Sequence, residues 1–222
     1  MIVVHHLNNS RSQRVLWLLE ELEVPYTVRR YERDPATMLA PKELRAVHPL
    51  GKAPVITDGD LTVAETGAII EYLLDTYGEG RLRPPPGPDR RRFTYWLHYA
   101  EGSAMPPLLL RLVASRLAGP QMPWLLRPVA RKISQGLQDK LINPQLRLHL
   151  DFMERELADR DWFAGPEFTA ADVQMSFPLE AAVARGGLGA DRPRLMAWLD
   201  RIHGRPAYQQ ALASGGDYEL LR

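Results

Sequence analysis

The sequence predicts an α/β domain over residues 1–80, followed by an all-helical domain over residues 90–222. Three observations support this division. Strand and helix patterns alternate up to Gly78, strand patterns are missing after residue 90, and the proline-rich segment RPPPGP separates the two regions. Proline lacks a backbone N–H and fixes φ, so this segment does not fit inside a helix or a central strand. We therefore expect residues 81–89 to form a linker between the two domains.

The first domain has five segments with a clear periodicity. Its strand segments are rich in β-branched residues or alternate polar with apolar residues, and its helix segments repeat apolar residues at i, i+3, i+4 and i+7. In chain order they are strand MIVVHHL, helix RVLWLLEEL, strand PYTVRRYE, strand pair APVITDGDLTVAE and helix ETGAIIEYLLDTYG. Asp58-Gly59 is a hairpin signal, Gly78 is a suitable helix end, and residues 35–47 are irregular or helical. The order strand-helix-strand, then strand-strand-helix (βαβ-ββα), predicts a thioredoxin-like domain.

Prolines interrupt the helical patterns of the second domain. Each removes a backbone donor, so we expect a kink or a break at each position. These prolines are Pro106, Pro107, Pro144 and Pro178.

Thr169 and Asp172 have the spacing of an N-terminal capping box, in which each side chain bonds the other's backbone N–H. Phe168 and Val173 are placed as the accompanying hydrophobic staple. We interpret Asp172 as a structural carboxylate and not as a catalytic one.

Composition excludes several classes of protein. The 28 basic and 27 acidic residues give a net charge of +1, unlike the basic footprint of a nucleic-acid-binding protein. We find no apolar run of the roughly 18 residues that a membrane span needs, and no secretory signal pattern. The chain has no cysteine, so no protein thiol can act as a nucleophile, and a reducing cytoplasmic location is expected.

Four segments, spread over almost the whole chain and in the same order, resemble segments of the cytosolic glutathione S-transferases. They are SRSQRVLWLLEEL, HPLGKAPVITDGDLTVAETGAIIEYLLDTYG, FTAADVQMSFPL and RPAYQQAL. The resemblance implies an enzyme of the serine/asparagine type, bacterial-like, which activates glutathione as a thiolate for conjugation to small hydrophobic electrophiles. Glutathione would be the co-substrate, with no metal. Alternatives are a glutathione-dependent peroxidase or disulfide reductase of the same fold, and a non-catalytic binding module.

The resemblance also implies a set of glutathione-binding residues. The loop before the third strand would contain a cis peptide bond between Ala53 and Pro54, and Val55 would pair its backbone with the ligand at an open sheet edge. A helix N-terminus attracts anions, so Thr66 would bind the γ-glutamyl carboxylate while Glu65 faces the ammonium group. Lys52 is either a solvated lysine or the partner of the glycine carboxylate. The implied set is Lys52, Pro54, Val55, Glu65 and Thr66.

Three residues near the end of the first strand are candidates to stabilise the thiolate. The chain has neither a cysteine nor a tyrosine there, which leaves Ser10, Asn9 and Ser12. A charge-assisted hydrogen bond contributes about 1.5–3 kcal/mol and a helix N-terminus about 0.3–1 kcal/mol, enough to lower a thiol pKa from about 8.5 to about 6–7. Ser10 and Gln13 also have capping-box spacing, S-x-x-Q, and the two roles are compatible because a capping hydroxyl keeps its own proton.

The start of the helical domain is expected to form the electrophile pocket. Tyr99, Ser103, Met105 and Pro106 are the candidates, although such a stripe is also typical of plain core. The six histidines have no metal-ligand spacing and are interpreted as structural or surface residues, with His5 and His6 on opposite strand faces. The resemblance further implies a homodimer, in which the thioredoxin-like domain of one subunit contacts the helical domain of the other.

Overall fold

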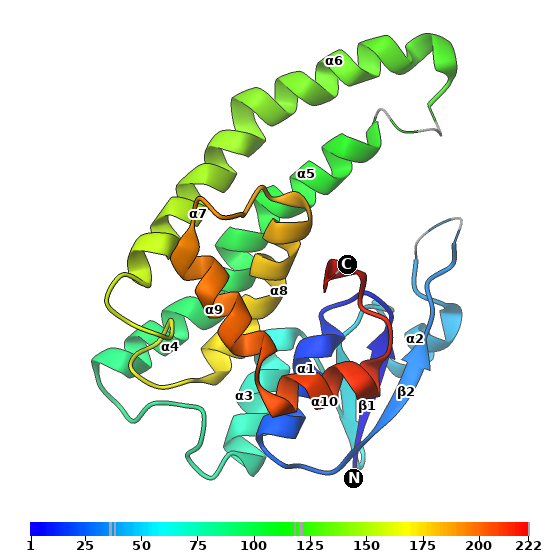
Figure 1. Cartoon of the computed structure of the whole chain (residues 1–222). Helices are drawn as coiled ribbons and strands as arrows, with labels where there is room; N and C mark the ends of the chain where they lie inside the picture. Colours follow the sequence, from blue (N-terminus) through cyan, green and yellow to red (C-terminus); the bar gives the residue numbers. More distant parts are fainter. Residues whose placement is uncertain (36, 38, 118, 120–121, 222) are drawn as a thin grey trace.

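The structure is a computed structural model, and it describes residues 1–35, 37, 39–117, 119 and 122–221. The N-terminal domain has a four-stranded sheet in the order β2-β1-β3-β4 (Figure 1). Strand β1 (Ile2–Leu7) is parallel to β2 (Tyr26–Tyr31) and antiparallel to β3 (Val55–Asp58), which forms a hairpin with β4 (Leu61–Ala64). This topology confirms the thioredoxin-like prediction.

Helices cover both faces of this sheet. Side chains alternate along each strand, so apolar residues of β1 lie on both faces and pack against helices on each side. Ile2 and Val4 of β1 pack into the main core, together with α1 and α3. Leu7 and Tyr31 point to the other face and form a small second core with Leu44 of α2. The helices are α1 (Ser12–Glu21), α2 (Lys42–Val47) and α3 (Thr66–Tyr77).

The C-terminal domain is entirely helical in its described part. Helices α5 and α6 form a hairpin that projects from the body of the molecule (Figure 1). None of the described helices combines the length and the apolar character needed to cross a membrane. The elements are α4 (Pro88–Tyr99), η1 (Ala100–Ala104), α5 (Met105–Leu117), η2 (Trp124–Leu126), α6 (Arg127–Leu137), η3 (Gln138–Ile142), α7 (Asn143–Glu156), α8 (Ala170–Arg185), α9 (Pro193–His203), α10 (Pro206–Gly215) and η4 (Glu219–Leu221).

The prolines act on these helices in two ways. Pro106, Pro107 and Pro144 lie in the first turns of α5 and α7, and each of these helices directly follows a π-helical turn, η1 or η3. A π turn widens the helix locally, which accommodates the missing donor without ending the helical path. Pro178 lies inside α8, which continues to Arg185, so of the expected kink or break there is no break at this position.

Pro178 has a clear consequence for the carbonyl four residues before it. In an ordinary helix residue 178 would donate to the carbonyl of Gln174, but proline has no N–H. The Gln174 carbonyl instead accepts a hydrogen bond from the guanidinium of Arg14, on α1 of the other domain. The proline therefore creates an acceptor that joins the two domains.

The capping box at the start of α8 is confirmed. The Thr169 N–H donates to Asp172 over 3.0 Å, and the Thr169 hydroxyl caps the first turn. Asp172 is fully buried and also accepts from the Phe163 N–H at 3.0 Å and the Trp198 indole at 3.2 Å. With its oxygens occupied by these donors, Asp172 holds three segments of the helical domain together.

Candidate active site

A cleft of about 730 Å³ lies between the two domains. One wall comes from the loop before β3 and from the start of α3, and the other comes from α4, η1 and α8. Lys52, Pro54, Glu65 and Thr66 all line this cleft. Four of the five residues assigned to glutathione by resemblance therefore lie together, and the peptide bond between Ala53 and Pro54 is cis.

Val55 does not have the open edge that the sequence interpretation gave it. It is fully buried in β3, and it pairs with His5 of β1 on one side and Ala64 of β4 on the other. Ala53 lines the cleft and lies outside the sheet, with no backbone hydrogen bond to another described residue. A ligand backbone can pair at Ala53, two residues before the predicted position.

The start of α3 is open to an anion. No side chain caps this helix, and the first-turn residues Gly67 and Ala68 line the cleft with little side-chain bulk. Thr66 is buried beside them, while Glu65 is exposed and has φ of 71°. A positive φ is unfavourable for glutamate, and such conformations cluster at ligand sites. The geometry provides free N–H groups, a hydroxyl and a carboxylate at one point of the cleft.

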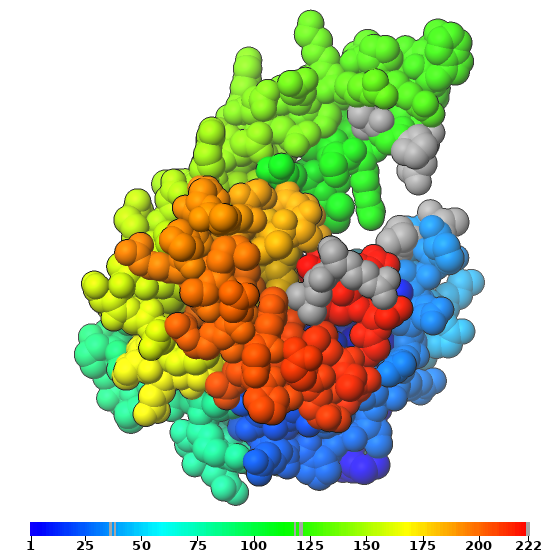
Figure 2. Space-filling model, in the orientation of Figure 1, coloured from blue at the N-terminus to red at the C-terminus, as the bar shows by residue number. Residues whose placement is uncertain are grey.

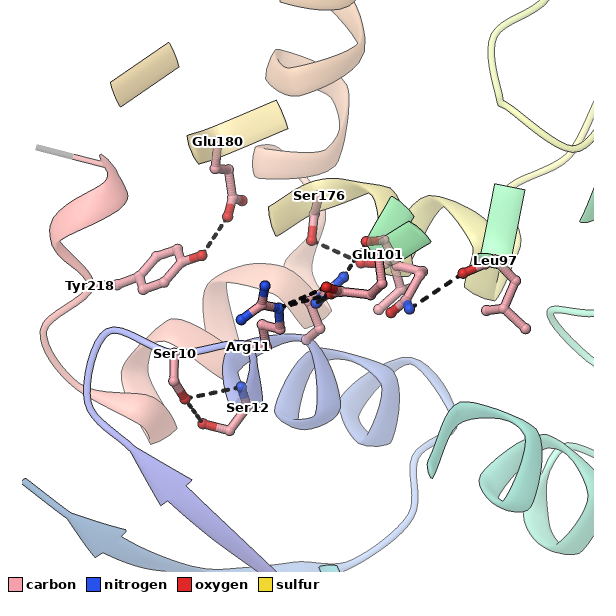
Figure 3. A network of polar contacts seen from close by, with 11 residues as sticks. Ser10, Arg11, Ser12, Leu97, Glu101, Ser176, Glu180 and Tyr218 are labelled. Carbon is pink, nitrogen blue, oxygen red and sulfur yellow. Dashed lines mark hydrogen bonds and ion pairs between the residues drawn. The ribbon is translucent and has the colours of Figure 1, made fainter. Parts of the chain in front are cut away.

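The serine hydroxyls at the start of α1 form a short chain of hydrogen bonds (Figure 3). The Ser10 and Ser12 hydroxyl oxygens are 2.7 Å apart, and the Ser12 hydroxyl is 2.9 Å from Nδ1 of His6. Burial, together with nearby Arg30, lowers the pKa of His6 to about 4, while a backbone hydrogen bond to Gly215 acts in the opposite direction. A neutral His6 that donates to the Gly215 carbonyl has an acceptor at Nδ1. The Ser12 hydroxyl therefore donates to His6. The Ser10 hydroxyl donates to Ser12, and its proton can turn from Ser12 towards a ligand.

The predicted Ser10–Gln13 capping box does not form. The Ser10 oxygen accepts from the Ser12 N–H at 3.2 Å, one residue short of the Gln13 N–H. The Gln13 side-chain nitrogen has no partner among the described residues, and α1 has no side-chain cap. Ser10 and Ser12 are both buried, and none of Asn9, Ser10 and Ser12 lines the cleft.

Asn9 is held by the C-terminal segment. Its side-chain oxygen accepts from the backbone N–H of Glu219 at 2.8 Å, and this bond fixes which end of the amide is oxygen. In the described part of the chain nothing accepts from its side-chain nitrogen, so two N–H donors remain available. Asn9 also has a φ of 51°, a conformation that asparagine tolerates better than most residues.

Arg11, which directly precedes α1, lines the cleft, and the sequence interpretation missed it. Its Nε lies 2.9 and 3.0 Å from the two oxygens of Glu101, which is in the π turn, and Glu101 also binds Arg14 (Figure 3). Burial acts to raise the pKa of Glu101, but the Arg14 and Arg11 charges outweigh it and hold the pKa below its usual value. The carboxylate is therefore ionised, and two guanidinium groups share one negative charge.

The predicted electrophile pocket is not confirmed, because none of its four residues lines the cleft. Tyr99 is buried and lies 2.5 Å from Nδ1 of His149, and Met105 is also in the core. Ser103 and Pro106 are not among the residues that line the cleft. The cleft wall is formed by Leu97, His98, Glu101, Gly102 and Gln174. The aromatic and methionine side chains fill the helical core, as such a stripe does in most helices.

Four of the six histidines bond side chains inside the protein. His5 bonds Tyr31, His6 bonds Ser12, His149 bonds Tyr99 and His203 bonds Glu180. The separate partners of His5 and His6 agree with opposite strand faces. His48 and His98 line the cleft, which their interpretation as structural or surface residues did not anticipate.

Comparison with known families agrees with this fold and cleft. Residues 1–75 match the glutathione S-transferase N-terminal domain, and residues 140–201 match the glutathione S-transferase C-terminal domain. These stretches make up more than half of the chain, and the chain belongs to the glutathione S-transferase family.

Individual relatives match over nearly their whole length. Glutathione S-transferase 3 of Schizosaccharomyces pombe is 35% identical over 222 residues, covering 99% of this chain and 90% of the relative. Glutathione S-transferase 1 of Saccharomyces cerevisiae is 31% identical, covering 98% of each. The crystal structure of a glutathione S-transferase from Actinobacillus pleuropneumoniae is similar with a TM-score of 0.82 and 34% identity, covering 100% of this chain and 96% of that one.

Proposed function

We propose that the cleft binds glutathione and activates its thiol for transfer to an electrophile. The observation that carries the proposal is the uncapped start of α3, next to Lys52 and the Ala53-Pro54 bond. The γ-glutamyl carboxylate would accept from the α3 N–H groups and from Thr66, and its ammonium would pair with Glu65. Lys52 would bind the glycine carboxylate, and Ala53 would pair with the cysteinyl backbone.

The thiol of glutathione would then lie at the start of α1. The positive charge of Arg11, only partly neutralised by Glu101, favours the thiolate, and the α1 dipole adds to it. The free N–H groups of Asn9 are the first candidate donors to the sulfur. The Ser10 hydroxyl is the second, since it must give up its bond to Ser12, and Ser12 is the weakest candidate.

The test begins with retention on immobilised glutathione. We expect the protein to be retained, and we expect it to conjugate glutathione to chlorodinitrobenzene. Thr66→Val should weaken both retention and turnover, whereas Arg91→Gln, an exposed change at the start of α4, should leave both unchanged. Failure of the wild-type protein to bind glutathione would refute the proposal. If the protein binds glutathione but turns over only a hydroperoxide or a disulfide, the reaction is a glutathione-dependent reduction and not a conjugation.

We further propose a homodimer in a reducing cytoplasm. Segment 58–80 has six acidic residues and no Lys or Arg, whereas segment 102–138 has five basic residues and no Asp or Glu. These charges complement each other between the thioredoxin-like domain of one copy and the α5–α6 hairpin of another. Large apolar side chains are exposed along that hairpin, including Leu109, Val113, Val129 and Ile133. Such a surface is typical of an interface, and sedimentation measurements would test it.

A further inference from the structure

A second pocket lies where α9 packs against α8 and α10. Figure 2 shows these helices together at the surface, coloured from gold to orange-red. The pocket has a volume of about 310 Å³, and none of the residues that line it also lines the glutathione cleft. Such a volume is at the lower end for small-molecule sites in proteins. We call it the α9 pocket, and it is large enough for a small organic ligand.

One face of α9 provides half of the lining. Its four residues follow the spacing i, i+3, i+4 and i+7, which places them on one side of a helix. They are Met196, Leu199, Asp200 and His203. A carboxylate and an imidazole thus share this face with two apolar side chains. The adjacent face of α9, with Leu195, Trp198 and Ile202, fills the core, so core packing does not account for the two polar groups.

The carboxylate of Glu180, on α8, lies in the wall of the α9 pocket and is almost completely buried. It accepts from the hydroxyl of Tyr208 at 2.7 Å and from that of Tyr218 at 2.6 Å (Figure 3). Burial and the charge of Glu180 raise the pKa of both tyrosines, so these two donors stay neutral. The Nε2 of His203 lies 3.3 Å away and is a cation only when protonated. The described part of the chain therefore gives Glu180 no permanent counter-charge.

A second carboxylate, that of Asp200, is exposed at the same pocket. Its side chain has no ion pair and no hydrogen bond with another described residue. The nearest arginines in the sequence are bound elsewhere, Arg201 to Asp161 at 2.8 Å and Arg205 to Glu21 at 2.6 Å. None of the described residues that line the pocket is a lysine or an arginine. The α9 pocket thus combines two carboxylates with apolar side chains and lacks a fixed positive charge.

We propose that the α9 pocket binds a small organic cation, a primary ammonium joined to an apolar group. An ammonium has three N–H donors, and it would donate to Glu180 and Asp200 in charge-assisted hydrogen bonds. The apolar group of the ligand would lie against Val183, Met196 and Leu199, where the flexible methionine adapts to its shape. This site is separate from the glutathione cleft, and its occupation does not depend on glutathione transfer.

Three compounds of similar size test the charge requirement: phenylethylamine as the cation, phenylethanol as the neutral compound and phenylacetate as the anion. The methyl carbon of Met196 reports binding at the pocket itself. The chain has seven methionines, so their methyl groups can be labelled with carbon-13, and Met196→Leu identifies the signal by its loss. The titrations use the full chain in the presence of excess glutathione, which keeps the probes out of the cleft.

We expect phenylethylamine to shift the Met196 signal with a saturable titration curve. Phenylethanol should bind about tenfold more weakly or worse, the effect of losing one charge-assisted hydrogen bond, and phenylacetate should not bind. Equal affinity for the amine and the alcohol would overturn the proposal. So would a Met196 signal that stays unmoved at millimolar amine, or displacement of the amine by glutathione. If the protein does not bind glutathione, the cleft proposal fails and the Met196 titration still decides this one.

Four variants assign the binding to the named residues. Asp200→Asn should weaken the amine several-fold, and Val183→Lys should abolish its binding because Val183 is 43% exposed and a lysine there brings a competing cation. Asp159→Asn removes an exposed carboxylate outside the pocket and should leave the affinity unchanged. Glu180→Gln should weaken the amine about tenfold or more. Its thermal midpoint shows whether it is folded, and the two surface variants carry the test if it is not. Wild-type affinity in both Asp200→Asn and Val183→Lys would overturn the proposal.

Discussion

Replacing Arg11 by glutamine should raise the pKa of the thiol of bound glutathione. Arg11 and Arg14 share the single carboxylate of Glu101, so the group has an excess of one positive charge. At about 4 Å and an effective dielectric constant of about 20, one such charge contributes about 4 kcal/mol to a thiolate. The Arg11 side chain is 34% exposed and already paired, so solvent and Glu101 reduce this value. We expect about 1–2 kcal/mol to remain, which is a rise of roughly one pKa unit.

The pH dependence of kcat/KM for glutathione measures this effect, and ultraviolet absorbance of the thiolate in the binary complex measures it without turnover. Arg11→Gln should move both midpoints upward by about one unit. Arg11→Lys should restore part of the shift, because it keeps the charge and loses the paired contact with Glu101. Arg91→Gln controls for the loss of one positive charge. A midpoint that stays at the wild-type value in Arg11→Gln would refute the electrostatic role of this arginine.

Four further outcomes follow from the structure. Asn9→Ala should raise the same midpoint more than Ser10→Ala, and the reverse order in the titration would return the thiolate to Ser10. Thr66→Val should raise the KM for glutathione by roughly tenfold with little change in kcat; a loss confined to kcat would contradict a binding role. Asp172→Ala should lower the free energy of unfolding by about 3 kcal/mol or more, because several buried donors lose their acceptor, while turnover per folded molecule stays constant; denaturant titration with an active-site assay separates the two. The pKa of His6 is lowered to about 4, below its unfolded value of 6.5, so its contribution to stability is present above pH 6.5 and is lost as pH falls towards 4. Urea titrations at pH 7 and 5 should differ by up to about 2 kcal/mol more for wild-type protein than for His6→Asn.

Local patterns predicted the elements of the fold well. β-Branched runs, the Asp58-Gly59 hairpin and the Thr169–Asp172 capping box each depend on neighbours within a few residues, and all three are confirmed. The open edge at Val55 was wrong because strand order is a long-range property. Only the sheet shows that β3 lies between β1 and β4.

The candidate site was predictable where it resembles a family segment and not elsewhere. Arg11 looks like an ordinary loop arginine, because its partner Glu101 is 90 positions away in the sequence. Tyr99 looks like a pocket residue because aromatic side chains occur in both pockets and cores. Burial separates the two cases, and burial depends on the packing of α4 against α7.

The contact between Arg14 and the Gln174 carbonyl bears on how the protein loses its structure. Trp17 packs against Phe168 and Tyr208, and the core of the first domain is continuous with that of the second. The linker thus connects two parts that share one interior. Cutting the chain there should leave both fragments associated, and heating should produce a single calorimetric transition with equal van't Hoff and calorimetric enthalpies. A thioredoxin-like fragment expressed alone would expose Trp17 and an unpaired Arg14, and its fate would be aggregation rather than independent folding.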